Sequence, residues 1–178
     1  STTGVGTIIT TFAAVGPSLP VLQFAMNQDS VFMVTNGWPA GRIWCYNKST
    51  SAVTYITYTA TLLPASMATD GTYIYLGTGG NFTNITLKKI SLDGTTVASK
   101  NANTVGEPWF LSFDGTNLWA ATSILGGFSG PANCIRKISP TDLSLLQTFD
   151  YSGATVEFAN LSMDAGYLYA ANRQQVEP

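Results

Sequence analysis

The chain has 178 residues, enough for one domain with a substantial core. Only 10 % of the residues are charged and the net charge is −2, so no basic surface is expected to follow the phosphates of a nucleic acid. No apolar run approaches the roughly 20 residues of a membrane-spanning helix, and we expect no membrane insertion. The first residues lack the charged and apolar regions of a signal peptide, which is typical of a mature form or an excerpt.

Short apolar segments separated by turn residues predict strands throughout, and no stretch of a dozen residues has the apolar periodicity of a helix. In chain order, the first strands are expected at 21–26, 31–35, 42–46 and 53–58. A second group is expected at 65–69, 73–76, 85–91 and 95–99, and a third at 108–113, 118–122, 134–139 and 143–149. The last two expected strands are 158–163 and 167–171.

A six-residue motif, which we call the recurring phrase, is repeated along the chain. It has Asp or Asn five residues before an aromatic side chain. Its copies begin at positions 27, 70, 114 and 164, so the offsets are 43, 44 and 50 residues. A period of about 40–50 residues with short strands and tight turns indicates the blades of a β-propeller. We therefore predict one all-β domain over 1–178, a propeller of about four four-stranded blades, with repeats at approximately 20–63, 64–106, 107–155, and 156–178 plus 1–19.

The two ends of the chain complement each other in this scheme. The fourth repeat stops before its last strand, and residues 7–12 match 143–149 in their pattern. We expect this N-terminal strand to complete the last blade, because closing the ring leaves no half-made sheet exposed. The strand either closes within the chain or pairs with the next subunit. A third alternative is that the chain is an excerpt of a larger propeller.

Residues 113–121, followed by 135–140, resemble the YVTN/NHL-type propeller repeats of bacterial surface proteins and viral structural proteins. The resemblance covers essentially the whole chain and is closest in the third repeat. It implies blades around an axis, with ligands bound on one face. Related propellers serve as adhesion and scaffolding modules and occasionally as lyases or hydrolases, so the function must be argued from a site.

The residues offer little for catalysis. The chain has no histidine, which removes the commonest general base and the commonest metal ligand. The Asp residues of the recurring phrase occupy turns, where a structural role is expected. Glu107 and Glu157 precede first strands in equivalent positions and suggest at most a weak cation site at one mouth of the axis. We expect no catalytic residue, no metal and no cofactor, and hence no enzyme.

Two further residue sets are read as structural. Cys45 and Cys134 occupy equivalent places in opposite blades, too far apart for a disulfide, and are expected to be free thiols that are buried or half-buried. The aromatic residues of the recurring phrase share one position in the second strands and are expected to pack in the core or between blades. They are Phe32, Tyr75, Trp119 and Tyr169.

Three loops between second and third strands carry an aromatic residue beside Gly or Pro, namely Trp38, Phe82 and Phe128. With Asn36 and Asn81 they are candidates for a binding rim that stacks on sugar rings or contacts another protein. The alternative is that each ring packs on the blade beneath it. Asn81 and Asn84 also fit the N-glycosylation pattern on a loop.

These observations predict a non-enzymatic structural and adhesive module of an extracellular or virion surface. Its low charge and its many Thr and Asn residues favour that setting. Its expected partner is a glycan or a surface protein bound through the loop rim. One alternative is an architectural subunit that self-associates head to tail by exchanging terminal strands. A cation-dependent propeller enzyme is the remaining alternative.

Overall fold

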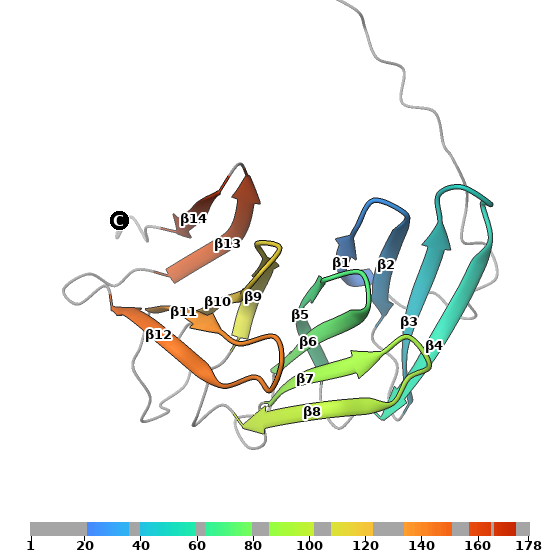
Figure 1. Cartoon of the computed structure of the whole chain (residues 1–178), viewed down its shortest axis with the longest axis horizontal. Helices are drawn as coiled ribbons and strands as arrows, with labels where there is room; N and C mark the ends of the chain where they lie inside the picture. The colour runs from blue at the N-terminus through green and yellow to red at the C-terminus, as the bar shows by residue number, and fades with distance from the viewer. Residues whose placement is uncertain are drawn as a thin grey trace, which may run out of the picture.

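The structure, a computed structural model, consists of β-strands in four antiparallel sheets (Figure 1). It describes residues 21–35, 40–59, 63–79, 86–101, 108–122, 134–150, 157–164 and 166–173. The predicted all-β class is confirmed, and these ranges contain no helix. In particular, they contain no helix long and apolar enough to cross a membrane.

Each sheet is a meander in which chain neighbours pair. The first sheet contains β1 (Val21–Met26), β2 (Ser30–Thr35), β3 (Ala40–Asn47) and β4 (Val53–Thr59). The second contains β5 (Leu63–Thr69), β6 (Tyr73–Gly79), β7 (Thr86–Ser91) and β8 (Thr96–Asn101). The third contains β9 (Pro108–Phe113), β10 (Leu118–Thr122), β11 (Cys134–Ile138) and β12 (Leu145–Asp150). The fourth contains β13 (Glu157–Asp164) and β14 (Tyr167–Arg173). The fourteen strands predicted between residues 21 and 171 are present, with ends that differ by a few residues.

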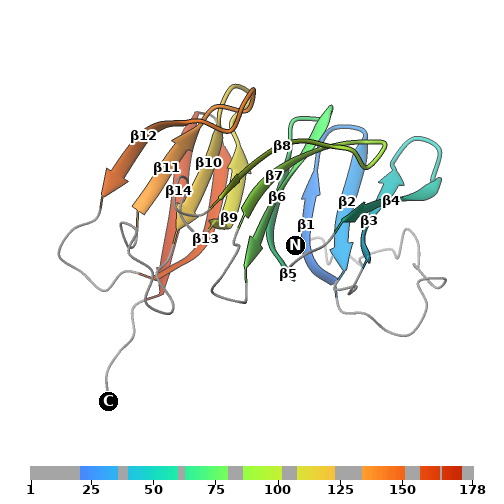
Figure 2. The same cartoon turned by 90° about the horizontal axis from the view of Figure 1, so that it is seen from below.

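The four sheets stand side by side in an arc, with their first strands on its inner side (Figure 1 and Figure 2). Strand β1 lies next to β5, β5 next to β9, and β9 next to β13. The last strands β4, β8 and β12 lie on the outer side of the arc (Figure 1). Each four-stranded sheet therefore runs from an inner first strand to an outer last strand.

The hydrophobic core is divided into three layers, one between each pair of consecutive sheets. Alternation along β6 explains this division, since successive side chains of a strand point to opposite faces. Ile74 and Leu76 pack against the first sheet, whereas Tyr75 packs against the third. All three side chains are fully buried, and each such burial contributes about 1.5–3 kcal/mol to stability. The second sheet is therefore held from both faces.

The recurring phrase builds the turn between the first and second strand of a sheet. Asp70 Oδ1 accepts hydrogen bonds from the backbone N–H groups of Thr72 at 2.8 Å and Tyr73 at 2.7 Å. Gly71 adopts a φ of 91°, a backbone conformation that a residue with a Cβ atom rarely adopts. Asp114 accepts the corresponding bonds in the third sheet. The predicted structural role of these two Asp residues is confirmed.

The expected packing of the aromatic residues in the recurring phrase holds for part of the set. Phe32 and Tyr75 are buried between sheets, and Trp119 is half-buried. Tyr169 is 56 % exposed, so the prediction that it packs in the core or between blades is wrong. The reason is its place on the last sheet, where no further sheet among the described residues covers it. The cysteine prediction is confirmed, because Cys45 is a half-buried free thiol and Cys134 a buried one.

Candidate functional site

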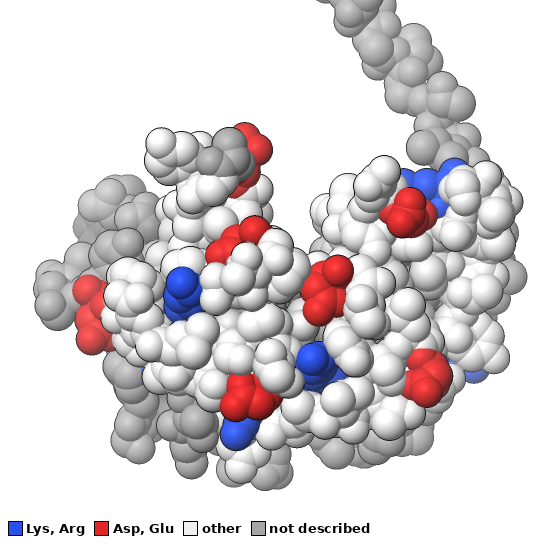
Figure 3. Space-filling view, viewed as in Figure 1, with Lys and Arg blue, Asp and Glu red and all other residues white. Residues whose placement is uncertain are grey.

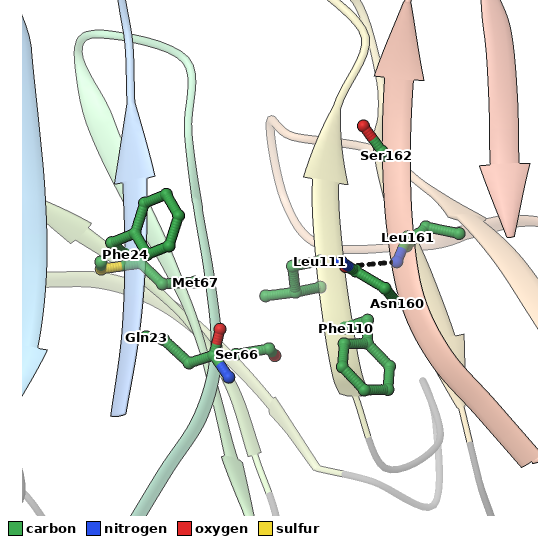
Figure 4. A pocket seen from close by; sticks show the side chains of 9 residues that line it. All are labelled: Gln23, Phe24, Ser66, Met67, Phe110, Leu111, Asn160, Leu161 and Ser162. Carbon is green, nitrogen blue, oxygen red and sulfur yellow. Dashed lines mark hydrogen bonds between the residues drawn. The ribbon is translucent and has the colours of Figure 1, made fainter. Parts of the chain in front are cut away.

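A cavity of about 280 Å³ lies between the first strands of the four sheets (Figure 4). Every sheet contributes to it, so the cavity exists only because the sheets are assembled. Its walls are formed by β1 and β5 on one side and by β9 and β13 on the other (Figure 4). The lining residues are Gln23, Phe24, Ser66, Met67, Phe110, Leu111, Asn160, Leu161 and Ser162.

One irregularity of register recurs in all four first strands. Each of them has one extra residue relative to the second strand of its sheet, at Leu22, Ala65, Trp109 and Ala159. These positions are offset by 43, 44 and 50 residues, as the recurring phrase is. An extra residue bends a strand and changes the direction of the side chains that follow. In each sheet the residue after this irregularity lines the cavity.

The four residues that follow the irregularity differ in chemistry. Gln23 carries an amide that makes no hydrogen bond within the described part of the chain. Asn160 Oδ1 accepts a bond of 2.7 Å from the backbone N–H of Leu161, which leaves its Nδ2 group as a donor. Ser66 donates its hydroxyl proton to the carbonyl oxygen of Pro108, on the next sheet. The cavity thus presents amide groups from opposite walls.

Aromatic and apolar side chains complete the lining. Phe24 is 62 % exposed, although the equivalent residues Met67, Leu111 and Leu161 are buried between sheets. Phe110 is half-buried and projects from β9 along the other wall (Figure 4). Exposed aromatic rings beside amide and hydroxyl groups are typical of sites that bind neutral, polar ring-shaped molecules.

The first strands also offer backbone groups. Each of the strands β1, β5, β9 and β13 pairs with one strand only among those described, the second strand of its own sheet. The other edge of each first strand faces the inner side of the arc (Figure 1). Such an edge carries backbone N–H and C=O groups that can bind a ligand.

The position of the cavity wall depends on a close approach between the second and third sheets. A Cβ atom at Gly77 would lie 2.6 Å from the carbonyl oxygen of Pro108 and would also meet the Ser66 hydroxyl. Only glycine therefore permits the hydrogen bond between Ser66 and Pro108 in this arrangement. That bond ties β5 to the start of β9.

No lining residue of the cavity is titratable. The carboxylates of Asp70 and Asp114 lie in the turns described above, each holding hydrogen bonds of its own sheet. Burial acts to raise the pKa of Asp70. Hydrogen bonds from the Tyr75 hydroxyl and from the N–H groups of Tyr73 and Thr72 together lower it by more than burial raises it, so its pKa lies below the usual value of 3.8. The described residues contain no group of three or more His, Cys, Asp or Glu side chains that could hold a metal ion.

The predicted rim residues lie outside the described ranges. This applies to Trp38, Asn36, Asn81, Phe82 and Phe128, and to the glycosylation candidate Asn84. It applies also to the expected closing strand at 7–12, to Glu107 and to the side chain of Glu157. The structure brings together a different set, which the sequence analysis missed because Gln23, Ser66, Phe110 and Asn160 share no residue type. Each of these residues precedes its copy of the recurring phrase by the same number of positions, and this equal spacing could have identified the set from the sequence.

No protein-family description matches this sequence, and no curated protein matches it as a relative. The site is therefore interpreted from its own residues.

Proposed function

We propose that the chain is a non-enzymatic structural and adhesive module of an extracellular or virion surface. In this proposal its four sheets are blades of a β-propeller related to the YVTN/NHL-type repeats, with the last blade completed by the N-terminal strand. The module holds its binding groups rigidly and contacts a glycan or a protein neighbour.

The arc of sheets supports the propeller interpretation. The first strands adjoin one another on the inner side, and each pair of neighbouring sheets encloses an apolar layer. The fourth sheet has two described strands where the others have four, which leaves an edge of β14 for a further strand. Residues 7–12 match the pattern of residues 143–149, the predicted last strand of the third repeat.

The observation that carries the binding role is the lining of the cavity. It combines the amides of Gln23 and Asn160, the hydroxyl of Ser162 and the ring of Phe110, and no titratable group. Amides and hydroxyls exchange hydrogen bonds with neutral hydroxyl groups, and an aromatic face stacks on the apolar face of a sugar ring. This set is suited to binding a neutral saccharide and supplies no acid or base for its hydrolysis.

A glycan-array measurement on the purified chain tests this proposal. The wild type is compared with a Trp38→Ala/Phe82→Ala/Phe128→Ala variant and with a Gln23→Ala/Phe110→Ala variant. Loss of binding in the first variant places the ligand on the loop rim, and loss in the second places it in the cavity. A Thr116→Ala variant, altered in an exposed turn, is the control and should bind normally. Absence of binding by the folded wild type to any glycan, together with no capture of surface proteins, would contradict the adhesive role.

A second candidate function is favoured by the two-stranded fourth sheet. Among the described strands β14 pairs only with β13, and its other edge can accept a strand from another subunit, which would make the chain an architectural subunit that polymerises by strand exchange. An Ile9→Pro substitution removes a backbone donor from the expected strand and should abolish such polymers while leaving folded subunits. Light scattering measures the change, and polymers that persist in the variant would exclude this mode.

A further inference from the structure

The two amide side chains of the cavity offer a ligand different hydrogen-bonding groups. Oδ1 of Asn160 accepts the backbone N–H of Leu161 at 2.7 Å, so this side chain offers a ligand only the N–H donors of its Nδ2. Gln23 makes no hydrogen bond within the described part of the chain, so its amide offers an acceptor as well as a donor. A ligand between the two walls therefore meets a donor on the β13 side and an acceptor on the β1 side (Figure 4).

The other lining groups narrow the kind of ligand. Ser66 adds no donor, because it gives its hydroxyl proton to the carbonyl oxygen of Pro108 and is almost fully buried. Met67 and Leu111 are buried apolar side chains that line the cavity beside the amides (Figure 4). Moving a methyl group from water to a place against such side chains is favourable. The cavity thus suits a small amide that carries a methyl group.

The volume of the cavity limits the ligand to a short group. It is about 280 Å³, which is near the lower limit of about 300–1,000 Å³ for small-molecule sites. The half-buried ring of Phe110 lies on one wall, and the exposed hydroxyl of Ser162 lies on the neighbouring strand (Figure 4). A ring face and a hydroxyl suit one sugar residue, which has an apolar face and hydroxyl groups of its own. A terminal residue of a glycan fits this volume better than an internal stretch of several residues.

We propose that the cavity binds the acetamido group of a neutral N-acetylhexosamine at the end of a glycan. This group is a planar secondary amide whose carbonyl oxygen and N–H point in opposite directions. Its oxygen accepts a bond from Nδ2 of Asn160, its N–H donates to Oε1 of Gln23, and its methyl group packs against Met67 and Leu111. A sugar hydroxyl has its donor and acceptor on a single oxygen atom and brings no methyl group. The inference rests on the proposed function, because it names the class of glycan that the module would bind.

Charge on the protein gives no reason to expect a charged sugar. No lining residue of the cavity is titratable, so an ammonium or carboxylate group would be held there without a partner. Charged side chains are scattered singly over the view of Figure 3 and form no large patch of one sign there. The same view is hollowed on the inner side of the arc, which leaves the region of the first strands open to a small ligand (Figure 3).

Matched monosaccharides test the acetamido group directly. N-acetylglucosamine, glucose and protonated glucosamine have the same ring and differ only in carrying an acetamido, a hydroxyl or an ammonium group at one carbon. N-acetylgalactosamine and galactose form a second pair with a different orientation of one hydroxyl. Each sugar is titrated with the whole chain, and its NMR signals report binding. In at least one pair the acetamido sugar should bind at least tenfold more tightly than its hydroxyl counterpart, and glucosamine should bind no better than glucose.

Two substitutions locate the group in the cavity. Asn160→Asp replaces the Nδ2 donor with an oxygen while keeping an acceptor for the N–H of Leu161, and Gln23→Met removes the opposite acceptor at nearly constant size. Each should abolish the tenfold preference for the acetamido sugar. Asn101→Asp and Gln147→Met make the same changes at exposed positions of the outer strands β8 and β12, and these controls should keep the preference. Circular dichroism shows that the variants are folded.

The outcomes separate this inference from the proposed function. Equal affinities of the wild type for the acetamido and hydroxyl sugars of both pairs would overturn the inference and leave glycan binding by other groups possible. A preference that persists in both folded cavity variants would overturn it by placing the acetamido group elsewhere. Tighter binding of N-acetyl-dialanine amide, a neutral peptide with the same secondary amide, would overturn it in favour of a peptide site. Binding of no sugar, here or on the glycan array, would contradict the glycan role itself.

Discussion

The indole Nε1 of Trp119 donates a hydrogen bond of 2.6 Å to Oδ2 of Asp114, five residues earlier in the chain. In the second sheet the hydroxyl of Tyr75 donates a bond of 2.6 Å to Oδ2 of Asp70. In both cases the other carboxylate oxygen holds the turn. The five-residue spacing of the recurring phrase therefore has a physical cause, since one carboxylate joins a turn to an aromatic side chain of the following strand.

Replacing Asp114 with Ala should destabilise the protein by about 1–3 kcal/mol. The substitution removes the acceptor of two backbone N–H groups and of the Trp119 indole. A hydrogen bond to a charged group contributes a net of about 1.5–3 kcal/mol, and water can bond to the groups that lose their acceptor in this half-buried turn. Urea denaturation followed by tryptophan fluorescence measures the change. Asp150→Ala removes an exposed carboxylate at the end of β12 and should change stability by less than about 0.5 kcal/mol. If Asp114→Ala and Asp150→Ala changed the free energy of unfolding equally, the role of Asp114 in joining the turn to Trp119 would be contradicted.

Stability should fall as the solution becomes acidic below pH 4. Burial acts to raise the pKa of Asp114, but bonds from the Trp119 indole and from the N–H groups of Asn117 and Thr116 together lower it below the usual 3.8. A carboxyl group whose pKa is lower in the folded state stabilises that state above its unfolded pKa. This contribution is lost as pH falls from about 3.8 through the folded value. Urea midpoints measured between pH 2 and pH 7 should show the decline.

An Asp70→Asn/Asp114→Asn variant tests the origin of this pH dependence. The first repeat already uses Asn27, whose Oδ1 accepts N–H bonds from Asp29 at 2.9 Å and Ser30 at 2.7 Å. Asparagine can therefore keep the turn without titrating, and the variant should show a shallower decline below pH 4. Asp142, with its pKa lowered to about 2 mainly by the Ser144 and Ser139 hydroxyls, is unchanged in both proteins. Parallel curves for the two proteins would assign the pH dependence to other carboxylates.

Gly77→Ala should destabilise the protein by about 1–3 kcal/mol, the usual cost of overpacking. The added methyl group would meet the carbonyl oxygen of Pro108 and the Ser66 hydroxyl, and would push the second and third sheets apart. Ala171→Val adds volume at the equivalent position of the fourth sheet, where the side chain is exposed, and is the matched control. Thermal unfolding of both variants and of the wild type at the same concentration measures the change. A Gly77→Ala variant as stable as the wild type would show that the close approach of the second and third sheets does not limit the size of this residue.

Lys89→Met should weaken the contact between the second and third sheets. The ammonium group of Lys89 donates a bond of 2.8 Å to the carbonyl oxygen of Pro140 and lies 3.9 Å from the centroid of the Tyr73 ring. Losing a charged donor in this buried place should cost about 1–3 kcal/mol of stability. The half-buried Lys100 makes no hydrogen bond within the described residues, so Lys100→Met is the control. Hydrogen exchange at the backbone of β11 should increase in the first variant and stay unchanged in the second.

Several features of the fold were predictable because they depend on neighbours in the sequence. Strand β9 was expected at 108–113 and occurs at Pro108–Phe113, since its apolar run ends at an Asp-Gly turn. The turn role of Asp70 was expected for the same reason, because its hydrogen bonds reach only two and three residues ahead. The exposure of Tyr169 was not predicted. Its burial depends on whether another sheet lies against it, and local sequence carries no information on that.

The amino-acid sequence by itself determined the repeat, the strands and the turns that join the first two strands of each sheet. These depend on side-chain alternation and on hydrogen bonds between residues a few positions apart. Only the tertiary structure decided which residues line the cavity. Gln23 and Asn160 face it because an extra residue precedes each of them and because four separate sheets pack into one arc. Residues more than a hundred positions apart line the same cavity through the packing of whole sheets, which no local pattern specifies.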